Sequence, residues 1–389
     1  MTTVTSPEET MSRLRREEFP VTSQKVWFNT ATYGPLPASN VRAQRQFLEG
    51  MMLGLDAPGL GHWWEGAAEV RGKVGQFIGC DPADIALLRS TGEGISLVSL
   101  GLDWQPGDEV VLYDQEFPSG VYPFLALQRK GVKVIFVRDR GRHRFDVDDV
   151  AEVMSDRTRA VCVSLVNCYH GFRAPVEQIS TLCRQRGCWL LVDAVQAVGV
   201  MPVDVTSLGA DLVTAHGYKS MCAGYGISFC FVSPDLRESL EVVAPGWKNI
   251  EDAPFIQKQL DYNLRYPPSA RRFESTVQNL AGMYGLGASI DLFLGAGLNL
   301  VGEWVLNISR TLADALTDKG YRVASSTRPG EMSGIISVEV PSGDAASTCA
   351  ALSEHKIKCA VRDGRLRISS HLFNNRDDIE RLIEALPPP

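Results

Sequence analysis

The chain has 389 residues, of which 44% are hydrophobic and 22% are charged, as in an ordinary globular protein. A formal net charge of −7 and the lack of a basic block argue against nucleic acid or an anionic membrane surface as the principal partner. Because there is no apolar run of about 18 residues and no apolar core near the N-terminus, we expect neither a membrane span nor a signal peptide. Nine cysteines without a Cys-x-x-Cys pair, and six histidines without metal-ligand spacing, predict a cytoplasmic protein with reduced thiols and no metal site.

The first part of the chain alternates helical and strand-like segments. Residues 1–24 are typical of a solvated, partly helical lead-in, and helical patterns follow over 38–54 and 64–78. Apolar strands are expected at 85–88, 109–113, 133–137, 160–166, 188–193, 212–214 and 227–232. Helical stretches between them begin at 94 and cover 119–130, 146–154 and 175–186. This alternation predicts an α/β fold with a mostly parallel central sheet covered on both faces.

The pattern changes after about residue 290. A long helix (297–318) precedes strand-like runs at 333–340, 357–361 and 366–369, with helices at 343–355 and 376–386. We therefore expect three parts: an N-terminal arm and helix (1–60) that joins the small domain, a large domain (61–290) and a smaller C-terminal α+β domain (291–389). Ligands of parallel sheets bind outside the carboxyl ends of the strands, and the candidate site residues cluster at those ends.

Asp193 and Lys219 follow two of the expected strands. A lysine at such a place can form a Schiff base with the aldehyde of pyridoxal phosphate (PLP). An aspartate can keep the pyridine nitrogen of this cofactor protonated, so that the ring accepts electrons from the substrate Cα. Acids and lysines near strand ends are common in α/β proteins. The interpretation of this pair as a PLP site therefore depends on the other segments described below.

Two segments offer parts of a cofactor site. Ser90-Thr-Gly-Glu-Gly94 follows a strand and opens a helix, where backbone N–H groups and the Thr91 hydroxyl can cradle a phosphate. The alternative is an ordinary capped helix start with turn glycines. Phe117, in Glu116-Phe-Pro-Ser119, can cover one face of a pyridine ring, or it can be a buried loop aromatic.

Two further segments bring polar groups to the same region. Asn167 and His170 end another strand within a run of polar residues, which is costly to bury without a task. Asn167 can hydrogen-bond the ring oxygen or the substrate, while His170 can equally be a structural histidine. Arg367 can clamp a substrate carboxylate with two parallel hydrogen bonds, or it can form a surface salt bridge.

With these motifs the chain resembles the class V aminotransferase family of fold-type-I PLP enzymes. The resemblance spans residues 28 to 375 and rests on Phe28-Asn-Thr-Ala31, Ser90-Thr-Gly-Glu-Gly94, Glu116-Phe-Pro-Ser119, Val192-Asp-Ala-Val-Gln-Ala-Val-Gly199, His216-Gly-Tyr-Lys219, Arg272-Phe-Glu-Ser-Thr276 and Arg367-Ile-Ser-Ser-His371. Within the family the chain looks closest to C–S lyases of thiol-metabolite pathways, such as those for ergothioneine, and to cysteine S-conjugate enzymes of lincosamide antibiotic biosynthesis.

The resemblance implies a role for each matched residue. Lys219 would carry the Schiff base and act as the base at Cα, Asp193 would pair with the pyridine nitrogen, and Gln196 would pair with the ring oxygen. Phe117 would stack on the ring.

Other matched residues would bind the substrate or the phosphate. Arg367 would hold the substrate α-carboxylate, with Asn29 in the same substrate group. The residues that would hold the phosphate are Thr91, Gly92, His216 and Tyr218, joined by Trp247 and Thr276 from the neighbouring subunit. The family therefore implies a homodimer with shared active sites.

Three departures from the family pattern narrow the function. Gly92 stands where threonine is common, and Tyr169-His170 replaces an apolar-threonine pair. Cysteine desulfurases carry a persulfide-forming cysteine between the last two small-domain strands, but here that connection is Asp363-Gly364. We therefore expect no protein-bound persulfide.

The resulting hypothesis is PLP-dependent processing of a cysteine S-conjugate. Either β-elimination would release a thiol, pyruvate and ammonia, or decarboxylation with oxidative deamination would give an aldehyde. A histidine of ordinary pKa can move a proton at neutral pH, so His170 or Tyr33 would set the outcome. The alternatives are an aminotransferase or epimerase of the same family, or a non-catalytic relative. A nicotinamide-dependent dehydrogenase is disfavoured because the dinucleotide fingerprint is absent.

Overall fold

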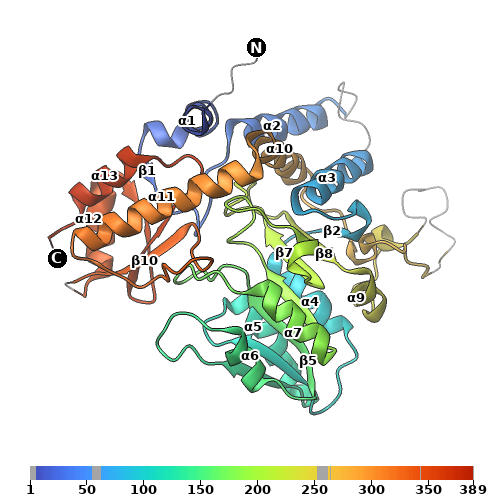
Figure 1. Ribbon diagram of the computed structural model, residues 1–389. Helices are drawn as coiled ribbons and strands as arrows, with labels where there is room; N and C mark the ends of the chain where they lie inside the picture. The colour runs from blue at the N-terminus through green and yellow to red at the C-terminus, as the bar shows by residue number, and fades with distance from the viewer. Residues whose placement is uncertain (1–5, 55–62, 252–261, 263, 342, 389) are drawn as a thin grey trace.

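The computed structural model describes residues 6–54, 63–251, 262, 264–341 and 343–388. A seven-stranded sheet with the order β2-β8-β7-β6-β5-β3-β4 forms its centre (Figure 1). The strands are β2 (Ile85–Leu88), β3 (Glu109–Tyr113), β4 (Lys133–Val137), β5 (Thr158–Ser164), β6 (Trp189–Asp193), β7 (Leu212–His216) and β8 (Ser228–Val232). The five strands from β7 to β4 run parallel, whereas β8 is antiparallel to both of its neighbours. The prediction of a mostly parallel central sheet is confirmed.

Both faces of this sheet are buried, which explains why its strands are apolar throughout. In β6, Leu190 and Val192 belong to one hydrophobic cluster, and Leu191 between them belongs to another on the opposite face. The helices of this part are α3 (Trp63–Ile78), α4 (Thr91–Gly101), α5 (Pro118–Leu125), α6 (Val147–Val153), α7 (Val176–Arg186), α8 (Val205–Leu208), α9 (Pro234–Ser239) and α10 (Leu280–Ala296). Short 3-10 turns occupy Pro20–Ser23, Pro82–Asp84, Ala126–Lys130, Trp247–Asn249 and Ala270–Phe273.

A second, antiparallel sheet with the order β12-β13-β10-β9 forms the C-terminal part. Its strands are β9 (Arg322–Val323), β10 (Ile335–Glu339), β12 (Ala360–Arg362) and β13 (Arg365–Ser369). The accompanying helices are α11 (Leu298–Asp318), α12 (Ala345–Glu354) and α13 (Arg376–Ala385). The smaller α+β unit predicted for this region is confirmed.

The N-terminal arm joins this C-terminal unit, and Figure 1 shows its blue ribbon beside the red elements. β1 (Val26–Trp27) pairs in parallel with β11 (Ile357–Lys358). α1 (Pro7–Glu18) is anchored by the Arg15–Asp378 ion pair at 2.6 Å, whereas α2 (Ala38–Met52) packs against α10. The expected domain boundary at residue 290 stays a prediction, and the one at 60–61 lies outside the described residues.

Three local predictions were wrong. The N-terminal lead-in is not simply solvated, because α1 buries Met11 and Leu14. α4 begins at Thr91 rather than at 94, because the Ser90 side chain caps it by accepting a hydrogen bond from the Glu93 N–H at 3.2 Å. The expected strand 357–361 is divided between two sheets as β11 and β12.

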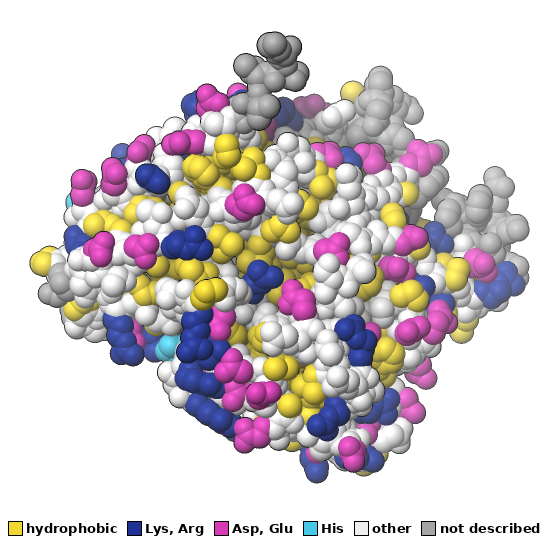
Figure 2. Space-filling view, viewed as in Figure 1, with side chains coloured by type: hydrophobic (Ala, Val, Ile, Leu, Met, Phe, Trp, Pro, Cys, Tyr) yellow, Lys and Arg dark blue, Asp and Glu magenta, His cyan; other side chains and the backbone are white. Residues whose placement is uncertain are grey.

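The face drawn in Figure 2 carries charged side chains of both signs together with patches of hydrophobic side chains. Figure 2 shows Lys and Arg side chains there next to Asp and Glu side chains. Within the described residues, no single helix is long and apolar enough to cross a membrane. α10 and α11 meet that requirement only as a pair bent by 82°.

Glu274 joins three separate segments of the large part. Its buried carboxylate (1% exposed) pairs with Arg71 of α3 at 2.8 Å and with Lys248 at 3.0 Å, and it accepts the Leu87 N–H of β2 at 2.9 Å. Burial raises the pKa of Glu274, but Arg71 and Lys248 outweigh it, so the pKa lies below its usual 4.5. This carboxylate therefore holds the segment that precedes Thr276 against α3, β2 and the turn that contains Lys248.

Glu274→Gln should lower the free energy of unfolding by about 3–5 kcal/mol, because two cations stay buried without the carboxylate that neutralises them. Because the folded-state pKa is lowered, the wild-type advantage exists above 4.5 and is lost as the pH falls below it. Urea denaturation at pH 7 and pH 4 measures both effects. Glu69→Gln is the control, since that exposed carboxylate pairs with Lys73 on the surface of α3 and should change stability by less than about 1 kcal/mol. An unchanged urea midpoint for Glu274→Gln would contradict this role.

Candidate active site

Asp193 and Lys219 meet at the carboxyl edge of the central sheet. Asp193 is the last residue of β6, where it pairs in register with Thr214 of β7, and Lys219 follows the end of β7 by three residues. Both side chains are buried, Asp193 at 3% and Lys219 at 6% exposure. Among the described residues the Lys219 amine forms no ion pair. It lies 5.0 Å from the centroid of the Phe117 ring and 5.5 Å from that of Tyr218.

Burial shifts the pKa values of this pair toward each other. It raises the pKa of Asp193 to about 6, although the Val195 N–H and the charge of Lys219 oppose that shift. It lowers the pKa of Lys219, and the positive charges of Arg367 and Arg362 lower it further, against Cys168 and Asp193. At pH 7 the aspartate is therefore mostly ionised, and the lysine is closer to its neutral, nucleophilic form than a surface lysine is.

Phe117 lies next to the Lys219 amine, on the loop that follows β3. The ring is 37% exposed and stands at the start of α5, so the buried-aromatic alternative is wrong. The neighbouring Glu116 holds the loop in place: it accepts the Ser164 N–H at 2.9 Å and the Ser164 hydroxyl at 2.6 Å. Burial raises the pKa of Glu116 to about 7. Sequence reasoning missed Glu116, for which the only signal is its place next to Phe117.

The expected phosphate end is formed by α4 and the β7 loop. Thr91 is the first residue of α4, and its hydroxyl is buried without a hydrogen-bond partner in the described part of the chain. An added Cβ at Gly92 would meet its nearest neighbour, Ser119, at 3.7 Å, an ordinary contact. Glycine is therefore not required there by space.

His216 and Tyr218 stand beside this helix start. Their rings pack edge to face at 4.4 Å, and Tyr218 stacks on Tyr225 at 4.8 Å. Burial, together with the charge of Lys219, lowers the pKa of His216 to about 4. His216 is therefore a neutral hydrogen-bonding group at pH 7.

Gln196 and Asn167 shape the walls of the site. Gln196 is 4% exposed and donates to the Ala31 carbonyl at 3.0 Å, which ties the N-terminal arm to the β6 loop. Asn167 donates to the Gln115 carbonyl at 2.8 Å and accepts the Tyr169 N–H at 2.8 Å. Both amides thus have structural tasks, and their predicted contacts with cofactor or substrate stay predictions.

Arg367 is a buried cation rather than half of a surface salt bridge. It is 2% exposed, and it donates to the Cys168 carbonyl at 2.6 Å and to the Thr32 hydroxyl at 2.7 Å. Thr32 in turn donates to the Asn29 side-chain oxygen at 2.7 Å. The Arg367 Nε–H has no partner among the described residues, and burial lowers the pKa of this guanidinium to about 10. A buried guanidinium with a spare donor suits an anionic ligand.

The two proposed product-controlling residues lie in different surroundings. Tyr33 is 41% exposed and packs edge to face on Trp27 at 4.9 Å, one residue before Gly34, whose N–H binds the Tyr218 carbonyl. The His170 ring instead contacts His143 and Tyr113.

Burial lowers the pKa of His170 to about 3, so the premise of an ordinary histidine pKa is wrong. The ring is neutral at pH 7 and packs against aromatic neighbours, but both of its nitrogens are buried without a hydrogen-bond partner among the described residues, so the role of His170 stays a prediction. The role of Tyr33 stays a prediction.

Trp247 and Thr276 are exposed on the surface of the single chain, Trp247 at 47%. Lys248, next to Trp247, binds Glu274, two residues before Thr276. The two residues therefore lie on segments that one buried carboxylate joins.

The structure adds two residues to the site that sequence reasoning did not select. Cys168 is 6% exposed, its carbonyl binds Arg367, and burial raises the pKa of its thiol to about 11. Arg362 ends β12, and its charge acts on both Lys219 and Arg367. Neither belongs to a recognisable motif, because each reaches the site through tertiary packing.

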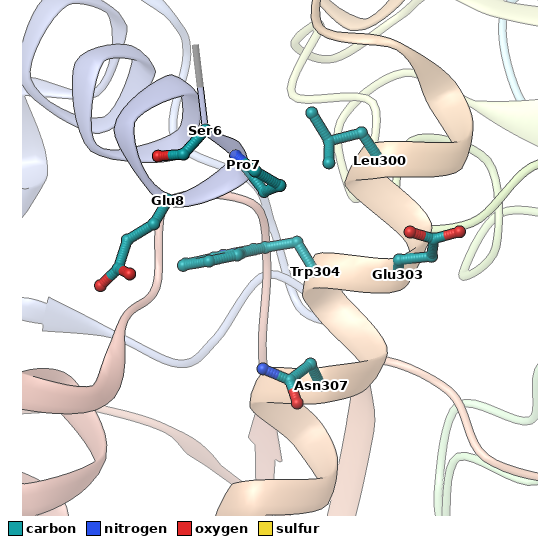
Figure 3. A pocket seen from close by; sticks show the side chains of 7 residues that line it. All are labelled: Ser6, Pro7, Glu8, Leu300, Glu303, Trp304 and Asn307. Carbon is teal, nitrogen blue, oxygen red and sulfur yellow. The ribbon is translucent and has the colours of Figure 1, made fainter. Parts of the chain in front are cut away.

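A separate pocket of about 380 Å³ lies between α1 and α11, where the Trp304 ring extends from α11 toward the first turn of α1 (Figure 3). Its lining residues are Ser6, Pro7, Glu8, Leu300, Glu303, Trp304 and Asn307. None of the candidate site residues lines it.

Comparison with known proteins identifies relatives over nearly the whole chain. The model of the aminotransferase class-V family matches residues 61–382. A probable cysteine desulfurase of Methanothermobacter thermautotrophicus is 27% identical over 394 residues, 95% of this chain and 96% of the relative. The apo cysteine desulfurase of Thermococcus onnurineus NA1 superposes with a TM-score of 0.86 at 23% identity, over 96% of both chains. The cystine C–S lyase C-DES, bound to its product cysteine persulfide, gives 0.86 at 22% identity, over 94% of this chain and 98% of that one.

Fold and site together define a fold-type-I PLP-dependent enzyme, and a C-DES structure holds glycine linked to that cofactor. The chain belongs to the aminotransferase class-V family. Its side chains fit the cofactor: Lys219 is a buried amine without an ion pair, Asp193 is a buried carboxylate, and Thr91 has an unpartnered hydroxyl at a helix start. Lys219 would hold the aldehyde of the cofactor, Asp193 the pyridine nitrogen and Thr91 the phosphate.

Lys219→Ala should abolish covalent cofactor binding and turnover, because the amine that attacks the aldehyde is lost. Borohydride reduction followed by mass spectrometry should find PLP on the wild-type peptide that contains Lys219 and on no peptide of the variant. Lys133→Ala is the control, since this exposed lysine lies at the opposite end of the parallel strands. Normal turnover by Lys219→Ala would contradict the assignment.

Arg367→Lys should weaken amino-acid binding about tenfold or more, because an ammonium cannot reproduce the planar two-point contact of a guanidinium. Cofactor content should stay at the wild-type level. Titration of the PLP-loaded protein with an amino acid, followed by visible absorbance, measures the affinity. Unchanged affinity would place the carboxylate site elsewhere.

Proposed function

We propose that this chain is a PLP-dependent C–S lyase that acts on cysteine or a cysteine S-conjugate. Relatives named as cysteine desulfurases and the C–S lyase C-DES support a cysteine-like substrate. The reaction consumes water and converts the S-conjugate to a thiol, pyruvate and ammonia. No oxidant is required.

The observation that favours a lyase over a desulfurase is the turn between β12 and β13. It consists of Asp363 and Gly364 alone, so no cysteine can extend from it toward the site. Cys359 precedes β12 and is buried, with its Sγ 3.5 Å from that of Cys349. The hydrogen bond with Cys349, and burial, raise the pKa of Cys359, which makes it a poor nucleophile.

The side chains of the site have the properties that elimination requires. PLP, when bound, withdraws electrons from the substrate Cα. Asp193 would hold the proton on the pyridine nitrogen, and Arg367 would hold the α-carboxylate. Lys219 Nζ removes the proton from Cα, helped by a pKa that burial lowers. Elimination follows when the sulfur substituent at Cβ leaves as a thiolate.

A homodimer with shared sites is part of the proposal. Trp247 and Thr276 are exposed in the single chain, so both are accessible to the phosphate of a PLP molecule held by a partner subunit. Hydrophobic side chains are also exposed on α2, namely Leu48, Met51 and Met52. Exposed apolar side chains of this kind are common at subunit interfaces.

The PLP-loaded protein incubated with S-ethyl-L-cysteine should give ethanethiol and pyruvate in equal amounts, with no carbon dioxide. Mass spectrometry of the intact chain should find no persulfide after incubation with L-cysteine. Cys359→Ser and Cys349→Ser should keep turnover within about twofold, because neither thiol carries sulfur. Carbon dioxide with an aldehyde would indicate decarboxylating deamination instead. Alanine with a persulfide on Cys359 would indicate a desulfurase.

A further inference from the structure

We propose that Arg362 binds a second anionic group of the substrate, a carboxylate on the sulfur substituent. This inference rests on the proposed function and narrows its substrate class to cysteine S-conjugates that carry a distal carboxylate. In this arrangement Arg367 binds the α-carboxylate, and Arg362 binds the carboxylate at the other end of the substrate.

Sheet register places Arg362 on the same face as Arg367. In the antiparallel pair β12–β13, Arg362 lies opposite Arg365, and Ala360 lies opposite Arg367. Side chains of opposite residues, and of residues two apart in one strand, extend from the same face. Three arginines therefore extend from one face of this hairpin.

Only one of these arginines is neutralised by acids. Arg365 pairs with Asp363 at 2.6 Å and lies 3.7 Å from Glu339. Arg362 donates to the carbonyl of its own neighbour, Val361, at 2.7 Å, and in the described part of the chain it has no carboxylate partner. Asp363 is the acid next to it in sequence, and that carboxylate is already held by Arg365.

The charge of Arg362 changes the pKa values of three neighbouring groups. After burial, Arg362 is the main cause that lowers the pKa of Arg367, and it also lowers the pKa of Lys219. Its charge lowers the pKa of Tyr169 as well, although burial raises that pKa. Arg362 therefore lies close enough to Lys219, Arg367 and Tyr169 for its charge to act on all three, and the hairpin register places it on the face that carries Arg367.

Arg367 and Arg362 both lack a carboxylate partner among the described residues, whereas the α-carboxylate of a substrate needs only one guanidinium. Arg367 is nearly fully buried and can satisfy that carboxylate with its spare Nε–H and its fork. Arg362 is half-buried, so its charge is partly desolvated and repels Arg367 until an anion reaches it. A dicarboxylate substrate relieves both penalties.

The test compares S-carboxymethyl-L-cysteine with S-carbamoylmethyl-L-cysteine, which has the same shape but a neutral amide. The wild-type protein should prefer the carboxylate compound about tenfold or more in kcat/KM, because a charge-assisted hydrogen bond from Arg362 stabilises that compound and not the amide. Arg362→Gln should reduce this ratio to about one. The ratio is the measurement, because loss of the charge that acts on Lys219 and Arg367 changes the rates of both compounds. Arg362→Lys should retain part of the preference. Arg365→Gln, a matched loss of charge on the same hairpin face, should retain all of it.

Binding gives a second measurement that does not depend on turnover. In the PLP-loaded Lys219→Ala background, calorimetry should show the same preference and its loss on Arg362→Gln. A wild-type ratio near one, or an equal loss for both compounds in Arg362→Gln, overturns the inference even where thiol is released. If neither compound releases thiol but calorimetry keeps the preference, the proposed lyase activity fails and the role of Arg362 stands.

Discussion

Parallel pairing of β5, β6 and β7 is the constraint on which the site depends. Asp193 lies opposite Ser164 of β5 on one side and Thr214 of β7 on the other. The loops that follow these three strands therefore all leave the sheet at the same edge. The backbone continues this alignment beyond the strands, since the Leu165 N–H binds the Asp193 carbonyl at 2.9 Å. A one-residue slip of β6 would turn Asp193 to the opposite face and separate it from Lys219.

Arg367 makes the site depend on the second sheet and the N-terminal arm as well as on the central sheet. Its guanidinium binds a carbonyl of the β5 loop and a hydroxyl of the N-terminal arm, while its backbone belongs to β13. The arm itself is held between β11 and β13, because Phe28 donates its N–H to the Lys358 carbonyl and its own carbonyl accepts the N–H of Ser369. The substrate-binding group is therefore correctly placed only when all three segments are assembled.

Much of this arrangement could be predicted from local patterns. Apolar strands, turn signals and the order of the motifs predicted the central sheet and placed Asp193, Lys219 and Phe117 at its carboxyl edge. The sequence did not reveal α10, because that helix is apolar on nearly all sides and rich in glycine, so no polar face marks its period. It also could not reveal how His170 is buried or which way Arg362 faces. Both depend on packing between segments far apart in the chain.

The Asp363-Gly364 turn links the absence of a sulfur-carrying cysteine to the presence of Arg362. Both residues have positive φ angles, 49° and 69°, as expected of a two-residue hairpin connection, for which Asp-Gly is a favoured pair. So short a turn leaves no loop that can carry a thiol to the substrate. It also holds Arg362 and Arg365 opposite each other at the strand ends, where Asp363 bends back to neutralise Arg365 alone. The same two residues thus leave no loop for a sulfur-carrying cysteine and leave Arg362 without a carboxylate partner among the described residues, which is the charge that the proposed second carboxylate would neutralise.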